Sequence, residues 1–100
     1  MGSLRITITA LKILEYLLQA QDEEAYALKI ARATGLSNGA LFPALDRLTK
    51  AGHLTSVLED IDEHVVGRRK RRYFKLTESG AQLARTELQR APALPSAILI

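Results

Sequence analysis

Apolar residues are spaced differently on the two sides of Gly52, and this difference limits the folds that the chain can adopt. Before Gly52 they recur at intervals of three and four residues, as in Leu11, Leu14 and Leu18, which is typical of amphipathic helices. After Gly52 they alternate with polar residues in the segments HLTSVLE and RRYFKLT, which is typical of short strands. The sequence therefore predicts an α+β fold, mostly α, in which helices precede a β-hairpin.

Three helices are predicted before Gly52. The first runs from Thr7 or Thr9 to Gln19, the second from Glu24 to Thr34 and the third from Asn38 to Ala51. The apolar face of the first helix is wider than the roughly 100° stripe that packs on one core. This surplus favours a second helix layer, which another subunit can supply.

The link TGLSNG joins the second helix to the third. Gly35 is placed to end the second helix in a left-handed conformation, and Leu36 is placed to enter the core. Ser37 is a favourable N-cap for the third helix. Two helices joined by so short a turn are the signature of a helix-turn-helix motif.

The hairpin and a last helix complete the predicted order. Phe74 points to the apolar side of the second strand, and the long tip DIDEHVVGRRK contains Gly67 as its turn residue. A fourth helix begins at the cap Thr77 and continues to Arg90, where the prolines that follow end it.

Pro43 lies inside the predicted third helix, although proline disfavours a helix interior. Its ring presses on the carbonyl group four residues earlier, which belongs to Gly39, and a residue without a side chain can yield there. Helix geometry places Gly39 and Pro43 on the outer side of this helix together with Asp46, Arg47 and Lys50. The outer side thus combines a bare backbone, a rigid ring and two cations.

The start of the third helix is the candidate segment for reading DNA bases. In a helix-turn-helix motif the first residues of the second helix reach base edges in the major groove. Ser37 and Asn38 are small and can donate or accept a hydrogen bond, and Gly39 permits close approach of a phosphate or base. The alternative is that Pro43 only ends a short first turn of an ordinary core helix.

Five basic residues run together from Arg68 to Arg72, within a chain of net charge +3. Such a run on a hairpin tip predicts contact with a polyanion, through phosphates or a narrow minor groove. The alternative is a solvated loop that is partly neutralised by the acids just before it, Glu59, Asp60, Asp62 and Glu63.

The length and composition exclude several protein classes. A chain of 100 residues forms one domain with a modest core. It contains no cysteine, which excludes disulfides and thiolate metal sites. Its apolar stretches are shorter than the roughly 20 residues of a membrane helix. We expect a cytoplasmic protein that does not insert into a membrane.

Catalytic and cofactor sites are not expected. No histidine stands at a helical spacing from Ser37 that would activate its hydroxyl. His64 lies among acids in the hairpin tip, but a loop-borne, oxygen-rich metal site there is disfavoured. We therefore predict a protein that is not an enzyme and that holds neither metal nor cofactor.

From Leu11 to Leu83 the chain resembles the PadR family of winged-helix transcription regulators. The resemblance depends on the blocks YALKIARATGLSNGALFPALDRLTKAGHL, GRRKRRYFKLT and ESG, in that order. The chain differs from the usual family pattern at Phe42, where the family has a tyrosine associated with DNA contact, and at His53, where it tends to have an aromatic residue. Many members also have a longer C-terminal region for dimerisation, whereas here only the fourth helix and an apolar tail follow.

The resemblance implies a winged helix-turn-helix domain over residues 1–91, with three helices, a two-stranded β-wing and a C-terminal helix, followed by an apolar tail at 92–100. The residues expected to bind DNA are Ser37, Asn38, Gly39, Phe42, Pro43, Arg47, Lys50, Arg68, Arg69, Lys70, Arg71 and Arg72. Those expected at a dimer interface are Leu11, Leu14, Leu17, Leu18, Leu83 and Leu88.

Together these features predict a sequence-specific regulator of transcription that binds double-stranded DNA. We expect a homodimeric repressor on a pseudo-palindromic operator, because a two-fold symmetric protein matches a two-fold symmetric site. A small-molecule effector is compatible with the family but unidentified. The alternative is a winged-helix module that binds another protein and has weak or no affinity for DNA.

Overall fold

The computed structural model describes residues 6–90. The order of its elements is α1 (Ile8–Gln19), β1 (Ala25–Tyr26), α2 (Ala27–Thr34), α3 (Asn38–Lys50), β2 (Leu54–Leu58), α4 (Glu63–Val66), β3 (Arg72–Leu76) and α5 (Glu78–Arg90). The mostly helical α+β class and the predicted order are confirmed, with β1 and α4 as additions. The predicted tail at 92–100, and residues 1–5 and 91 of the predicted domain, lie outside the described residues.

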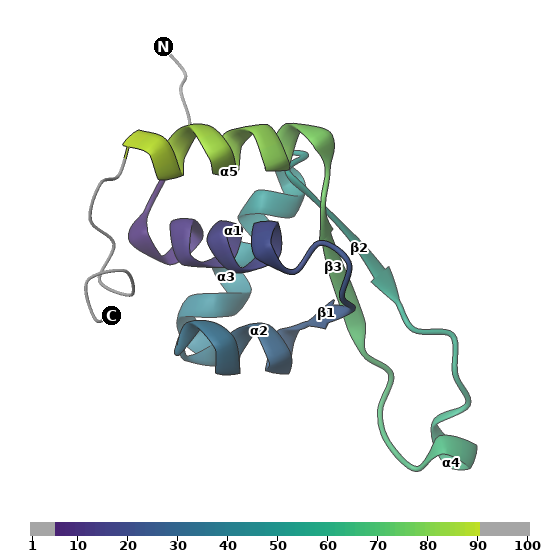
Figure 1. Ribbon diagram of the computed structural model, residues 1–100. Coiled ribbons are helices and arrows are strands. Elements are labelled where there is room, and N and C mark those ends of the chain that lie inside the picture. The colour runs from purple at the N-terminus through teal and green to yellow at the C-terminus, as the bar shows by residue number, and fades with distance from the viewer. Residues whose placement is uncertain (1–5, 91–100) are drawn as a thin grey trace.

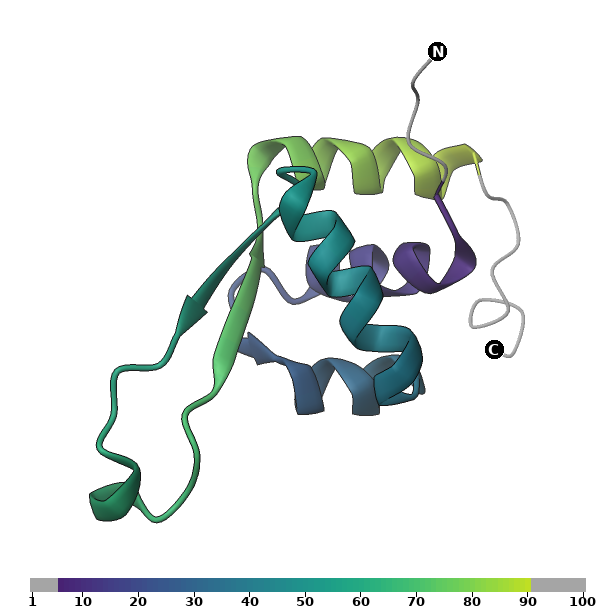
Figure 2. The ribbon, with the colours of Figure 1, turned by 180° about the vertical axis from the view of Figure 1, so that it is seen from behind.

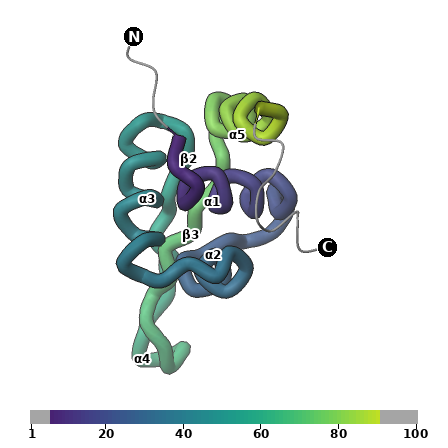
Figure 3. The backbone as a smooth tube through the Cα atoms, turned by 90° about the vertical axis from the view of Figure 1, so that its left-hand side faces the viewer, coloured from purple at the N-terminus to yellow at the C-terminus, as the bar shows by residue number. Residues whose placement is uncertain are grey.

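Helix α1 lies in the middle of a helical body, between α5 on one side and α2 and α3 on the others (Figures 1 and 3). It begins at the N-cap Thr7, whose Oγ1 accepts a hydrogen bond from the backbone N–H of Ala10 at 3.0 Å. Its wide apolar face is covered within the chain, since Ile13 and Leu14 are completely buried. The second helix layer that the sequence predicted is therefore α5 of the same chain.

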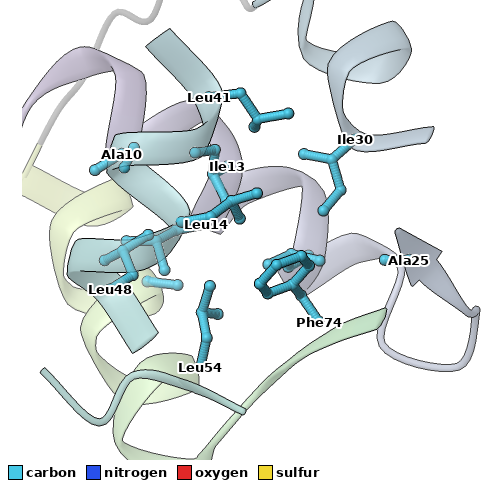
Figure 4. Close-up of a cluster of buried hydrophobic side chains, with 13 residues drawn as sticks. Ala10, Ile13, Leu14, Ala25, Ile30, Leu41, Leu48, Leu54 and Phe74 are labelled. Atoms are coloured by element: carbon cyan, nitrogen blue, oxygen red, sulfur yellow. The ribbon is translucent and has the colours of Figure 1, made fainter. Parts of the chain in front are cut away.

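The core joins this helical body to the sheet. Figure 4 shows Ile13 and Leu14 of α1, Leu41 and Leu48 of α3, and Phe74 of β3 gathered in one cluster. Burying each such side chain stabilises the fold by about 1.5–3 kcal/mol. One face of α3 is fixed against the core in this way, which leaves its opposite face to solvent.

The second helix is shorter than predicted, because its expected first residues form a strand. Ala25 and Tyr26 pair antiparallel with β3, opposite Phe74 and Tyr73 respectively, so α2 begins at Ala27 instead of Glu24. The predicted two-stranded wing is accordingly part of a three-stranded sheet of order β1-β3-β2. The cause is tertiary: β1 satisfies backbone groups along an edge of β3 that would otherwise be unpaired.

The wing consists of β2, β3 and the connection between them, and it projects beyond the helical body (Figures 1 and 2). Its tip, predicted as a loop, contains the one-turn helix α4. The Oδ1 of Asp62 caps this turn by accepting from the backbone N–H of His64 at 2.9 Å. Gly67 ends it at φ +82°, a left-handed conformation that glycine adopts without steric cost, which confirms Gly67 as the turn residue.

The start of α5 is fastened to the turn between α3 and β2. The hydroxyl of Thr77 donates to the backbone oxygen of Gly52 at 2.7 Å, and the backbone N–H of Thr77 donates to the backbone oxygen of His53 at 3.1 Å. Gly80 lies so close to this turn that a Cβ at its position would overlap the backbone oxygen of His53. We call these four residues the joint, because they fix the base of the wing relative to the end of α3.

Candidate nucleic-acid interface

The local sequence of α3 determines which of its faces meets solvent. Ser37 is the N-cap, as predicted, and its Oγ accepts from the backbone N–H of Ala40 at 3.3 Å. Leu41, Leu45 and Leu48 are almost completely buried. Because side chains three and four residues apart share a helix face, the residues between these leucines are directed outward.

The outer face of α3 consists of the residues that the sequence placed there. Those exposed to solvent are Asn38, Gly39, Phe42, Pro43, Asp46, Arg47 and Lys50. Pro43 lies inside the helix and on this exposed face. A Cβ added to Gly39 would have only the Oγ of Ser37 within 4.0 Å, so the backbone at Gly39 is open to close approach from outside.

A groove of about 350 Å³ lies between α3 and the wing. Phe42 and Asp46 line it from α3, while Ser56 and Arg72 line it from β2 and β3. Arg72 is held in place because its Nη1 donates to the Oγ of Ser56 at 3.2 Å. The outer face of α3 and the base of the wing thus form one continuous surface, with Phe42 half exposed at 50%.

Glu59 organises the end of the wing strands that lies nearer the tip. Its two carboxylate oxygens accept from the guanidinium of Arg68 at 2.7 and 2.9 Å, and they also accept from the backbone N–H of Arg71 and from the hydroxyl of Tyr73. The Arg68 hydrogen bonds, with the smaller help of Arg71 and Tyr73, lower the pKa of Glu59 to about 2 despite the opposing effect of burial. The same pairing raises the pKa of Arg68.

The five consecutive basic residues are therefore not equivalent. Arg68 is paired with Glu59, and the guanidinium carbon of Arg71 lies 4.2 Å from the centre of the Tyr26 ring, in a cation–π contact. Within residues 6–90, the side chains of Arg69 and Lys70 are exposed and have no hydrogen bond or ion pair. These two are the cations of the run that are free to meet an external anion.

The leucines predicted at a dimer interface fall into two groups. Leu11, Leu14 and Leu17 are buried in the protomer's own core, with at most 6% of their surface exposed. Leu18, Leu83 and Leu88 are half-buried. Only the second group retains area for a contact with another molecule.

Sequence reasoning missed two contributors to this surface. Tyr26 was expected on a helix, but it belongs to β1, where it supports Arg71 and packs edge-to-face on Tyr73 with ring centres 5.7 Å apart. Asp46 was placed on the outer face but was not assigned a role, although it lines the groove. Glu59 was named among the acids that neutralise the run, and its pairing with Arg68 bears out that part of the alternative.

Neither a candidate metal site nor a membrane-spanning helix is found within residues 6–90. No group of three or more His, Asp or Glu side chains there is arranged to hold a metal ion. No helix in that range is both long and apolar enough to cross a membrane.

Comparison with known proteins gives one family. The model of the transcriptional regulator PadR-like family matches residues 13–86, which include both the helix-turn-helix and the wing. No curated protein matches the chain.

Several solved structures have the same fold. A PadR family transcription regulator from Clostridium difficile is 21% identical, with a TM-score of 0.69, over 86% of this chain and 88% of that one. A protein from Ralstonia eutropha is 26% identical, with a TM-score of 0.65, over 84% of this chain and 99% of that one. MepR from Staphylococcus aureus, in a complex with DNA, is 21% identical with a TM-score of 0.67 over 84% of this chain. This chain spans 63% of the length of that MepR chain.

Proposed function

The chain belongs to the PadR-like family of transcriptional regulators, and from this premise we propose that it is a repressor that binds a specific double-stranded DNA sequence as a homodimer. The observation that carries the proposal is the continuous surface formed by the outer face of α3 and the base of the wing, with its groove of about 350 Å³. MepR, which has the same fold, is known in a complex with DNA.

In the proposed complex α3 lies in the major groove. Asn38 and Gly39 stand at its first turn, where helix-turn-helix proteins approach base edges. Arg47 and Lys50 lie on the same exposed side and can neutralise phosphates. Arg69 and Lys70 extend this contact from the wing to the flanking backbone or minor groove. Phe42 offers an apolar surface in place of the hydroxyl that the family's usual tyrosine would supply.

The proposed dimer uses the outer sides of α1 and α5. The C-terminal end of α5 lies over the N-terminal end of α1 (Figure 1), so Leu88 and Ile8 belong to the same end of the molecule. Ile8 is 57% exposed, although it is apolar. Leu18 and Leu83 lie farther along the same two helices. A contact along both helices would relate two copies by a two-fold axis. Such a dimer predicts half-sites separated by about 34 Å or a multiple of that distance.

Selection of bound sequences from random duplex DNA tests the proposal. We expect an enriched pseudo-palindrome, and we expect light scattering after gel filtration to give the mass of a dimer. Affinity that is the same for the selected site and for random DNA at physiological salt would contradict sequence specificity. A single half-site, bound by a monomer, would contradict the dimer.

A protein-interaction module is the second candidate, and the wing tip favours it. Val65 is 81% and Val66 48% exposed on α4, and the preceding Asp62 and Glu63 disfavour a phosphate at that end of the tip. This candidate predicts no measurable affinity for any duplex at low salt. The α3 surface would then have no assigned ligand.

A further inference from the structure

Asp46 places a negative charge on the surface that is proposed to bind a polyanion. Its side chain is 62% exposed, and its Oδ2 lies 3.0 Å from the ammonium of Lys50, whose side chain is 77% exposed. An ion pair so exposed contributes little to stability, because water screens it and both side chains lose freedom. Folding therefore gives only a weak reason for an acid at this position.

The position of Asp46 directs it toward a ligand in the groove. It lies one turn after Phe42 along α3, and both residues line the hollow between α3 and the wing. It is also in the middle of the helix, away from the N-terminal backbone donors that an acid commonly caps. A carboxylate so placed repels phosphates and can only accept hydrogen bonds.

We propose that Asp46 determines base specificity by accepting a hydrogen bond from the exocyclic amino group of a cytosine in the major groove. This inference rests on the proposed function. Of the four bases, guanine and thymine present only acceptors at this edge, and adenine presents its amino group beside the N7 acceptor. Cytosine alone presents a donor without a neighbouring acceptor of its own, so a carboxylate favours cytosine over adenine and rejects the other two.

Two neighbours support this assignment. Lys50 offsets the charge of Asp46 and thereby reduces the repulsion that the carboxylate meets as α3 approaches the duplex. Phe42 lies about 6 Å away along the helix axis, and successive base pairs are about 3.4 Å apart. Phe42 and Asp46 can therefore reach base pairs within about two steps of each other, and the apolar ring suits a thymine methyl group.

The test compares Asp46→Asn and Asp46→Ala with the unchanged protein on duplexes that differ at single positions of the selected site. In the unchanged protein, one cytosine in each half-site should be required, with a loss of about fivefold or more on replacement by thymine or guanine. Asp46→Ala should reduce this discrimination to less than about twofold, because binding to the disfavoured bases no longer meets the carboxylate. Asp46→Asn should move the preference to adenine, which an amide contacts through two hydrogen bonds.

A matched control is Asp22→Asn, which removes the same charge from an exposed acid in the loop between α1 and β1. It should leave the base preference unchanged, and circular dichroism should show all variants folded. If both Asp46 variants raise the affinity for every duplex by the same factor without changing base preference, Asp46 acts only through repulsion and the inference is wrong. If the unchanged protein binds no duplex, the proposed function itself fails, whatever the variants do.

Discussion

The outer face of α3 and the basic run of the wing both carry cations, but the fold holds these cations differently. On α3, Arg47 and Lys50 are exposed on a face whose opposite side is fixed by the core. On the wing, Arg68 is bound to Glu59 and Arg71 covers the ring of Tyr26. The run Arg68–Arg72 has more cations in sequence, yet Arg69 and Lys70 are the ones of this run without a partner within residues 6–90.

The difference shows that a run of cations combines two functions. Arg68 and Arg71, in the segment just before β3, shape the wing, because Arg68 pairs with Glu59 across the hairpin and Arg71 covers the ring of Tyr26 in β1. The residues between them are available for DNA. A hairpin without a large core of its own needs such polar contacts for rigidity, and a rigid wing loses less conformational entropy when it binds.

The largest expected effect comes from Gly80→Ala, which breaks the joint that both regions share. The added methyl group would overlap the backbone oxygen of His53, so either α5 or the base of the wing must move. We expect the free energy of unfolding to fall by about 3 kcal/mol or more, as in severe overpacking. Denaturant unfolding followed by circular dichroism measures it. A loss below about 0.5 kcal/mol would mean that the joint is not rigid.

The next largest effect should separate the two kinds of wing cation. Log affinity falls linearly with log salt, and the double variant Arg69→Ala/Lys70→Ala should make this fall shallower. The magnitude of the slope should decrease by about 1.8, since each lost phosphate contact contributes about 0.9. The thermal stability of the variant should stay close to that of the unchanged protein.

The matched variant is Arg68→Ala/Arg71→Ala, which removes the same charge. It should lower thermal stability, because Glu59 and Tyr26 lose their partners, and it should change the salt slope less. Fluorescence anisotropy over a range of salt concentrations, with thermal denaturation of each variant, checks both. If the two double variants change the salt slope equally, then Arg68 and Arg71 contact DNA as much as Arg69 and Lys70 do, and the proposed division of roles is wrong.

A smaller effect is expected at Gly39 of α3, where, unlike at Gly80, there is space for a side chain. The Cβ of an alanine would lie in open space there, so Gly39→Ala should stabilise the protein by up to about 1 kcal/mol through helix propensity. The same methyl group should weaken specific DNA binding if the backbone at Gly39 approaches a base or phosphate. Denaturant unfolding tests the expected gain in stability, and fluorescence anisotropy on the same sample tests the expected loss of DNA affinity. Unchanged DNA affinity would place the DNA contact elsewhere on α3.

Features that depend on neighbouring residues could be predicted from the sequence. The caps Thr7 and Ser37 and the helix end at Gly35 follow from side chains and backbone preferences within a few residues. Strand β1 could not, because it exists only by pairing with β3, far later in the chain. A local helical pattern around Tyr26 was overridden by that pairing, which is the common reason for such errors.

The candidate site divides in the same way. The exposure of Pro43 and Arg47 followed from helix periodicity once the leucines of α3 were assigned to the core. The division among the wing cations depends on hairpin register, because Glu59 meets Arg68 nine residues later and Arg71 twelve residues later. The sequence could not show whether Leu14 is buried in the protomer's own core or at a dimer contact, since both places require an apolar side chain.

The smallest expected effect concerns Glu59 and acid pH, and it tests whether the wing is shaped by this carboxylate. The pKa of Glu59 is lowered from 4.5 to about 2 in the folded protein, mainly by the hydrogen bonds from Arg68. A lowered folded-state pKa means that the stabilisation is fully present above pH 4.5 and is lost as the pH falls toward 2. The effect should be modest because solvent screens a pair at the surface. Melting temperatures of the unchanged protein and of Glu59→Gln should therefore converge between pH 4.5 and 2, whereas Asp60→Asn, at the exposed next residue, should not show this convergence. A constant difference between the unchanged protein and Glu59→Gln across that range would mean that the wing is held by its backbone pairing, and that Arg68 is as free as Arg69 to bind an anion.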